Sequence, residues 1–240
     1  MSRERLIVAL DVPTPREALK LVERLDDAAN FYKLGMQLLS AGGYMGLVDE
    51  LHQRGHKVFA DLKFFDVPAI VGAAVRGLRE RGVEFLTVHG NQAIMEAAAE
   101  NKGGSMKILA VTALTSLDRG DLDDLGFDCD IDELVLSRAR RAVEAGCDGV
   151  IASGRELPVL RQALGNRLLV VTPGIRPLDN NEVQDQKRVV TPRAAIAGGA
   201  DHIVVGRPIN AAGDPRSAAL AIQAEISRGL APGAGGPAPG

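Results

Sequence analysis

The chain has 240 residues, of which 46% are hydrophobic and 25% are charged, as expected for one ordinary globular domain. Its formal net charge of −3 gives no general attraction to nucleic acid or to an anionic membrane, and it has no tryptophan, two tyrosines and six phenylalanines, too few for a base-stacking platform. No apolar run approaches the roughly 20 residues that cross a bilayer, so no nucleic-acid or membrane partner is expected.

Short apolar runs typical of buried parallel strands alternate along the chain with helical patterns. The helical stretches, such as 14–25, 67–82 and 131–146, repeat apolar residues three and four apart. Eight repeats predict an α/β fold, a single (β/α)8 TIM barrel over residues 1–229. A doubly wound open sheet is the alternative, but no second block of composition supports it. The expected strands are 6–12, 31–36, 57–64, 84–90, 107–114, 149–153, 168–174 and 202–208.

Three segments depart from this rhythm. The acidic connection 116–132 is expected to be a solvated loop, because its spacing matches no calcium-binding loop. The polar segment 175–192 is long enough to be a functional lid. The tail 230–240 consists of Gly, Pro, Ala and one Leu, and it is expected to be disordered.

Cysteine usage and the N-terminus predict a cytoplasmic protein. Cys129 and Cys147 are the only cysteines, and two isolated cysteines make neither a disulfide framework nor a CxxC metal or redox site. The N-terminal apolar run is too short for a signal peptide.

Charged residues interrupt the apolar strands at the end where a barrel of this kind holds its active site. Asp11 ends the first expected strand, Lys33 lies on the second, and the third carries Asp61 and Lys63, two apart and hence on one face, with Asp66 three residues later. Neighbouring strands would therefore place charges of alternating sign around the barrel mouth. A purely structural ion network is the alternative, but a buried ion pair adds little stability, so the pattern favours chemistry.

Polar residues end the next three strands as well. Thr87 and His89 share a face of the fourth strand, and His89 is expected to make a loop or helix-cap hydrogen bond rather than act as a base. Thr112 and Thr115 lie near the end of the fifth, where Thr115 is expected to contact a ligand or cap the next segment. Ser153 is expected to be a turn or cap residue.

Glycine and arginine occur together at the ends of strands seven and eight, in TPGIRP (172–177) and VVGRPI (204–209). Many barrels hold a phosphate in this region. Exposed backbone N–H groups and bidentate guanidinium groups suit phosphate oxygens, so Arg176, Gly206 and Arg207 are candidates. No dinucleotide-binding or metal-binding motif occurs, and Lys63 between Asp61 and Asp66 argues against magnesium. The chemistry is expected to use side chains alone, with no cofactor and no metal.

Together these motifs resemble the orotidine 5′-phosphate decarboxylase family. The resemblance runs in order from residue 6 to about 228. It comprises ALDV, YKLG, DLKFFDVP, TVHG, VTALTS, TPGIRP, DQKRVVTP and VVGRPI. DxKxxD by itself identifies only a superfamily, whereas its combination with TPGIRP, DQxR and VGRPI is specific.

The resemblance implies decarboxylation of orotidine 5′-monophosphate to UMP and CO2, the last step of de novo pyrimidine nucleotide synthesis. Lys33, Asp61, Lys63 and Asp66 would form the charge network, with Lys63 as the proton donor to C6. Asp66 would enter the active site of the neighbouring subunit, which implies a homodimer.

The resemblance also implies the substrate contacts. Asp11 and Lys33 would bind ribose hydroxyls, and Thr115 would contact the pyrimidine. Gly206 and Arg207 would hold the phosphate. Two further contacts, by Gln186 to phosphate and base and by Arg176, would come from the closing loop.

The chain departs from the family pattern after the DxKxxD motif. A polar pair ending in a threonine is expected there, and the sequence has Ala69 and Ile70, which puts a cross-subunit ribose contact in doubt. Phe65 stands where many members carry histidine. The assignment of Gln186 rather than Gln184 rests on the KR that follows it.

Two other functions remain open. A metal-dependent sugar-phosphate decarboxylase or synthase of the same superfamily would be sensitive to EDTA. A non-catalytic barrel that binds phosphoribosyl ligands would bind UMP without turnover, although the complete set of four charges argues against it.

Overall fold

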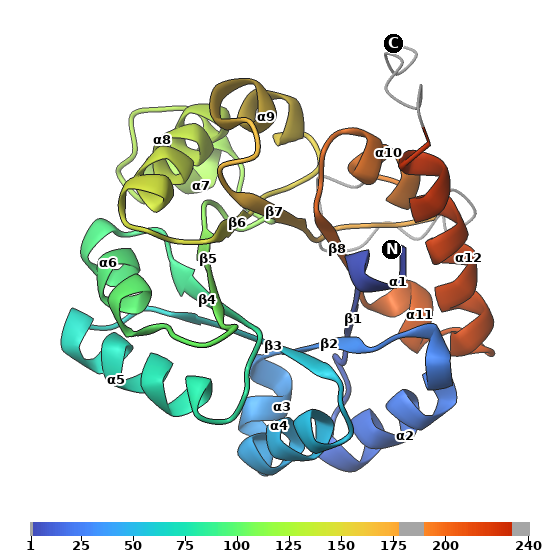
Figure 1. Ribbon diagram of the computed structural model, residues 1–240. Coiled ribbons are helices and arrows are strands. Elements are labelled where there is room, and N and C mark those ends of the chain that lie inside the picture. Colours follow the sequence, from blue (N-terminus) through green and yellow to red (C-terminus); the bar gives the residue numbers. More distant parts are fainter. Residues whose placement is uncertain (1, 178–189, 232–240) are drawn as a thin grey trace.

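The computed structural model describes residues 2–177 and 190–231 and has eight parallel strands that close into a barrel. Each strand pairs with the next along the chain, and β8 pairs with β1, so the predicted (β/α)8 barrel is confirmed. Figure 1 shows the helices as an outer layer around this ring. The strands are β1 Leu6–Ala9, β2 Phe31–Leu34, β3 Lys57–Phe64, β4 Phe85–His89, β5 Lys107–Val111, β6 Gly149–Ile151, β7 Leu169–Thr172 and β8 His202–Val205.

Twelve α-helices and one short 3-10 helix lie in the described part of the chain. None of these helices is long and apolar enough to cross a membrane. The helices are α1 Ser2–Arg5, α2 Pro15–Leu25, η1 Asp26–Ala28, α3 Met36–Ser40, α4 Tyr44–Gln53, α5 Pro68–Arg79, α6 Gln92–Asn101, α7 Arg119–Asp124, α8 Ile131–Glu144, α9 Leu157–Leu164, α10 Pro192–Ala197, α11 Arg207–Asn210 and α12 Pro215–Gly229.

Side-chain alternation along the strands divides the core into two parts. Outward-facing residues pack under the helices, and the inward-facing residues form a separate cluster inside the barrel. At the N-terminal end of the barrel the rings of Phe31, Phe85 and His202 meet edge to face, with centroids 4.9–5.9 Å apart. At the other end the inward residues are Ala9, Phe59, Val111, Ile151 and Val204, which form the floor of a cavity.

Most strands end earlier in the structure than the sequence pattern predicts. β1 stops at Ala9 rather than at residue 12, and β8 stops at Val205 because Arg207 already begins α11. Residues beyond the hydrogen-bonded ladder turn into the loops around the barrel mouth, and there they line the cavity. Asp11 therefore lies in the connection after β1 and not on the strand.

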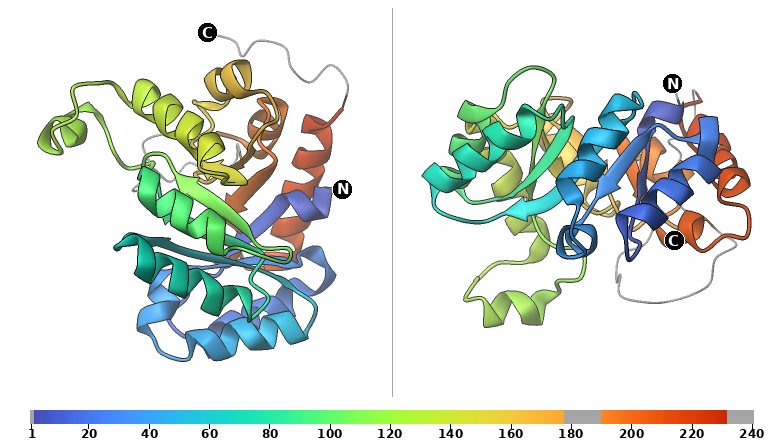
Figure 2. Two further views of the ribbon diagram at one scale, coloured as in Figure 1. Left: turned by 60° about the vertical axis from the view of Figure 1, so that its left-hand side comes forward. Right: turned by 90° about the horizontal axis from the view of Figure 1, so that it is seen from below.

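The connection 116–132 is not the plain solvated loop that its acidity predicts. It contains α7, whose N-terminus is closed by a capping box: Asp118 accepts from the Asp121 N–H (3.2 Å), and Asp121 accepts from the Asp118 N–H (2.7 Å). Figure 2 shows this segment standing out from the barrel in both views. A second capping box, Asp130 with Glu133, begins α8.

The segment 175–192 lies mostly outside the described residues, which resume at residue 190. Its two ends lie together, because Arg176 N–H donates to the Val190 carbonyl (3.0 Å). Of the predicted tail, only Leu230 and Ala231 are described, so its disorder stays a prediction.

Candidate active site

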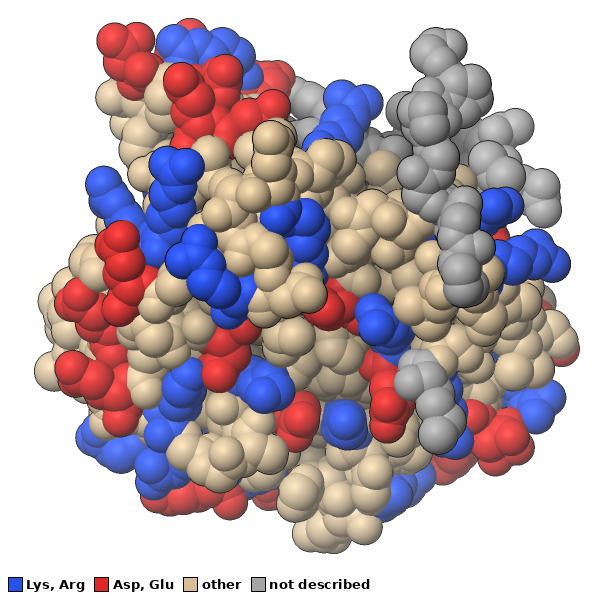
Figure 3. All heavy atoms as spheres, turned by 45° about the horizontal axis from the view of Figure 1, so that its top comes forward, with Lys and Arg blue, Asp and Glu red and all other residues tan. Residues whose placement is uncertain are grey.

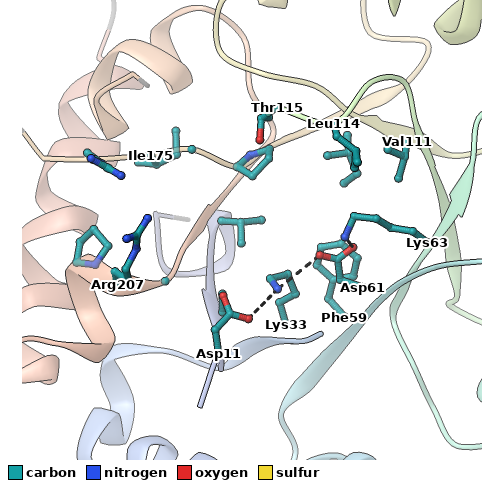
Figure 4. Close-up of a pocket in the computed structure, with 18 of the residues that line it drawn as sticks. Asp11, Lys33, Phe59, Asp61, Lys63, Val111, Leu114, Thr115, Ile175 and Arg207 are labelled. Carbon is teal, nitrogen blue, oxygen red and sulfur yellow. Dashed lines mark hydrogen bonds and ion pairs between the residues drawn. The ribbon is translucent and has the colours of Figure 1, made fainter. Parts of the chain in front are cut away.

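A cavity of about 560 Å³ opens at the C-terminal ends of the strands. Its volume is in the range of small-molecule sites, and its position is where barrels of this kind carry their chemistry. Side chains from β1, β2 and β3 lie along one wall, and the segments after β5 and β7 lie opposite. Figure 4 shows Lys63 at one end and Arg207 at the other.

The four charges Asp11, Lys33, Asp61 and Lys63 form one chain of alternating sign along this wall. Lys33 Nζ lies 3.1 Å from Asp11 Oδ1 and 3.5 Å from Asp61 Oδ2, and Lys63 Nζ lies 2.8 Å from Asp61 Oδ1 (Figure 4). Gly35 leaves room for this chain, because a Cβ there would stand 3.3 Å from Lys33 Nζ. The predicted array is therefore present in the structure.

Asp61 is the shared member of the chain and has a side chain only 15% exposed. Burial by itself would raise the pKa of its carboxyl, but Lys33, Lys63 and the hydroxyl of Thr87 together hold this pKa below its ordinary value. Asp61 is therefore ionised near neutral pH, as a partner for two ammonium groups must be.

Lys63 reaches the cavity by a route that regular alternation does not predict. Ala60 pairs with Leu86 and Phe64 with Val88, so β3 advances four residues where β4 advances two. Within this bulge Lys63 has a φ of +48°, in the left-handed region that a residue with a side chain rarely adopts. Such a conformation costs about 1–3 kcal/mol and persists only where the surroundings hold it, most often at functional sites.

Asp66 lies apart from the other predicted charges. It does not line the cavity, and its carboxylate accepts a hydrogen bond from the Val67 N–H (2.6 Å). Among the described residues of this single chain, Lys63 is paired with Asp61 and not with Asp66, so the two aspartates do not both flank Lys63 inside one subunit.

The remaining predicted ligand contacts divide between the cavity and the undescribed segment. Thr115, Arg176, Gly206 and Arg207 all line the cavity. Arg207 begins α11, the short helix after β8, a position where many barrels bind phosphate. Gln186 lies outside the described residues, so its role stays a prediction.

Other strand-end residues have structural partners instead. Thr112 donates to the Ile151 carbonyl (2.7 Å), and His89 Nδ1 lies 2.8 Å from Asn91 Oδ1 in the following loop, as expected. Ser153 begins a turn, because its carbonyl accepts from the Glu156 N–H (3.2 Å) and its own N–H donates to the Glu156 carboxylate (2.7 Å). Thr87, to which the sequence assigned no role, hydrogen-bonds both Asp61 and Lys63.

On the face drawn in Figure 3, the Lys and Arg side chains are interspersed with those of Asp and Glu. No group of three or more His, Cys, Asp or Glu side chains among the described residues is arranged to hold a metal ion.

Comparison with known proteins decides the family. Residues 4–222 match the model of the "Orotidine 5'-phosphate decarboxylase / HUMPS family". The chain belongs to this family. An orotidine 5′-phosphate decarboxylase of Methylococcus capsulatus is 62% identical over 93% of this chain and 92% of its own length, and one of Cereibacter sphaeroides is 54% identical over 94% and 98%.

A solved family structure gives the same result. The crystal structure of orotidine 5′-phosphate decarboxylase from Lactobacillus acidophilus superposes with a TM-score of 0.82 at 35% identity, covering 92% of this chain and 98% of that one. The resemblance inferred from the motifs is thereby confirmed at the level of sequence and fold.

Proposed function

We propose that this protein decarboxylates orotidine 5′-monophosphate to UMP and CO2, the last step of de novo pyrimidine nucleotide synthesis. The observation that carries the proposal is the charge chain ending in Lys63, set over an apolar floor with Arg207 at the far end of the same cavity. Relatives at 62% and 54% identity carry the name of this activity.

The arrangement suits a substrate with an anionic phosphate at one end and a reacting carboxylate at the other. Arg207 and the backbone at Gly206 would bind the phosphate, with Arg176 beside them on the segment after β7. Asp11 and Lys33 would bind the ribose hydroxyls, and Thr115 would contact the pyrimidine from the opposite wall. Gln186 would complete the grip on phosphate and base.

The proposed reaction needs only the side chains of the chain itself. As the bond from C6 to the carboxylate breaks, its electron pair stays on C6 and CO2 leaves. The Lys63 ammonium stabilises the developing carbanion and then transfers a proton to C6, which gives UMP. Preorganised charge in a site with an apolar floor is worth more than the same charge in water, so neither a cofactor nor a metal is required.

We further propose that Asp66 acts in the active site of a second copy of the chain. In one subunit Asp66 does not line the cavity, and it lies among exposed apolar residues: Phe65, Val67 and Ile70 are 66%, 60% and 55% exposed. A run of this kind beside an active site is typical of an interface. Ile70 would then replace a hydrogen-bonding contact with an apolar one. A cytoplasmic location stays a prediction from the sequence.

The function is tested by following the ultraviolet absorbance of orotidine 5′-monophosphate with purified protein in EDTA. The proposal predicts rapid loss of absorbance without metal. Turnover of a sugar phosphate that needs added magnesium, with none of the nucleotide, would establish the sister activity instead. Binding of UMP without any turnover would establish a non-catalytic barrel.

A further inference from the structure

Thr87 on β4 connects the two residues at the reacting end of the charge chain. Its side chain is fully buried and does not line the cavity. The hydroxyl donates to Asp61 Oδ1 (3.0 Å) and accepts from the backbone N–H of Lys63 (3.0 Å). One hydroxyl thus contacts both the carboxylate that pairs with the proton donor and the main chain that carries the donor.

The contact to the Lys63 backbone lies where the sheet is broken. Between Ala60 and Phe64 the bulge takes β3 out of register with β4, and Lys63 adopts a φ of +48° within it. A buried backbone N–H without a partner is costly, and the Thr87 oxygen accepts from this one. The threonine therefore satisfies and fixes the backbone that aims the Lys63 side chain.

The contact to Asp61 orients the carboxylate and helps to keep it ionised. Asp61 faces Lys33 from β2 and Lys63 from β3, with the hydroxyls of Thr87 on β4 and Tyr44 on α4 nearby. Burial raises the pKa of the Asp61 carboxyl, while the two lysines and the Thr87 hydrogen bond lower it. Removing the hydroxyl takes away one of the three contacts that orient the carboxylate and raises the pKa of Asp61.

We propose that Thr87 is a positioning residue for the decarboxylation, which locks Lys63 and Asp61 into the geometry required for proton transfer. This inference rests on the proposed function, since it assigns Thr87 a role in that reaction. Thr87 would act through these two residues and would not touch the substrate, so its loss should lower kcat and leave substrate binding nearly unchanged.

The test compares Thr87→Val, Thr87→Ser and Thr112→Val with the wild type. Valine keeps the shape of threonine without its hydroxyl, and serine keeps the hydroxyl. Thr112 is an equally buried threonine near the next strand end, whose hydroxyl donates to a backbone carbonyl outside the charge chain. Hydrogen exchange of the Lys63 N–H is measured in parallel, because it does not depend on activity.

Thr87→Val is expected to lower kcat about 10- to 100-fold, the effect of losing a hydrogen bond to a charged group, with KM within about threefold. The acid limb of kcat/KM should move to higher pH, and the Lys63 N–H should exchange faster. Thr87→Ser and Thr112→Val should stay near the wild type in kcat.

The proposal is wrong if Thr87→Val keeps the wild-type kcat, or if Thr87→Ser loses as much as Thr87→Val. Should Thr87→Val fail to fold, Thr87→Cys replaces it, because a thiol is a weak donor and acceptor and should give a partial loss of kcat. If the wild type shows no turnover, the proposed function is wrong. Hydrogen exchange then still tests the positioning role, which is refuted if the Lys63 N–H exchanges equally fast in the wild type and in Thr87→Val.

Discussion

At the scale of single residues, the site shows why its charges are not there for stability. Lys33 and Asp61 are both largely buried, and removing such groups from water costs about as much as their mutual attraction returns. A barrel wall that needed only stability would have apolar side chains at these positions. Phe31 and Phe59, two residues earlier on the same strands, are apolar and lie inside the barrel. The charges therefore favour a role in chemistry.

His202, at the opposite end of the barrel, gives stability a dependence on pH. It packs edge to face on Phe31 and Phe85, and burial lowers the pKa of its imidazole to about 4, against a smaller opposing effect of the Glu4 carbonyl. Between this value and the ordinary 6.5 the unfolded chain binds a proton that the folded chain does not. Stability from His202 is therefore present above pH 6.5 and is lost as the pH falls towards 4.

We predict that proton binding to His202 in the unfolded chain lowers the free energy of unfolding by about 2 kcal/mol when the pH falls from 7 to 5. Urea unfolding at both pH values checks the prediction with His202→Gln, in which this part of the loss should vanish. His52→Gln, at an exposed histidine on α4, is the matched control and should keep the wild-type dependence. An unchanged pH dependence in His202→Gln would contradict the assignment.

At the scale of elements, the sequence pattern predicts the strands and helices whose apolar residues recur at regular intervals. Eight apolar runs separated by helical patterns indicate the barrel, and the structure confirms it. Helix α7 lies in the acidic segment 116–132, for which the sequence predicts a solvated loop. Asp118 and Asp121, three residues apart, carry the capping signal that could have predicted its start.

Strand β3 shows what periodicity cannot supply. Regular alternation predicts that Asp61 and Lys63 share a face, and both do reach the cavity, but Lys63 does so from a bulge with a left-handed backbone. No local signal marks a lysine for that conformation, because it depends on the Thr87 hydroxyl from the next strand. The one feature of the sequence that points to this contact is Thr87, a hydroxyl-bearing residue on the strand next to the one that contains Asp61 and Lys63.

At the scale of the whole molecule, the position of Asp66 makes one chain an incomplete site under the proposed function. The cavity of a single subunit contains Asp11, Lys33, Asp61 and Lys63 but not the second aspartate of the DxKxxD motif. In the proposed dimer the exposed apolar side chains around Asp66 would be covered by the second subunit. Assembly and catalysis should therefore be inseparable.

Mixing two inactive variants tests this directly. Lys63→Ala and Asp66→Ala should each be inactive alone, and each mixed dimer should contain one site with both residues intact. After subunit exchange at equal amounts, about a quarter of all sites should be active. If mixing restores nothing while pull-down through an affinity tag on only one of the two variants shows that mixed dimers form, Asp66 does not act across the interface.

Under the proposed function, Lys63 protonates the substrate without help from a metal. A direct test is the rate of orotidine 5′-monophosphate decarboxylation in EDTA by the wild type, Lys63→Ala and Lys57→Ala. Lys57 lies on the same strand at the other end of the barrel, so its variant controls for loss of charge from β3. We predict rapid turnover by the wild type and by Lys57→Ala, and loss of at least about a thousandfold in Lys63→Ala. Comparable turnover by Lys63→Ala would rule out Lys63 as the proton donor, and no turnover by the wild type would rule out metal-free decarboxylation.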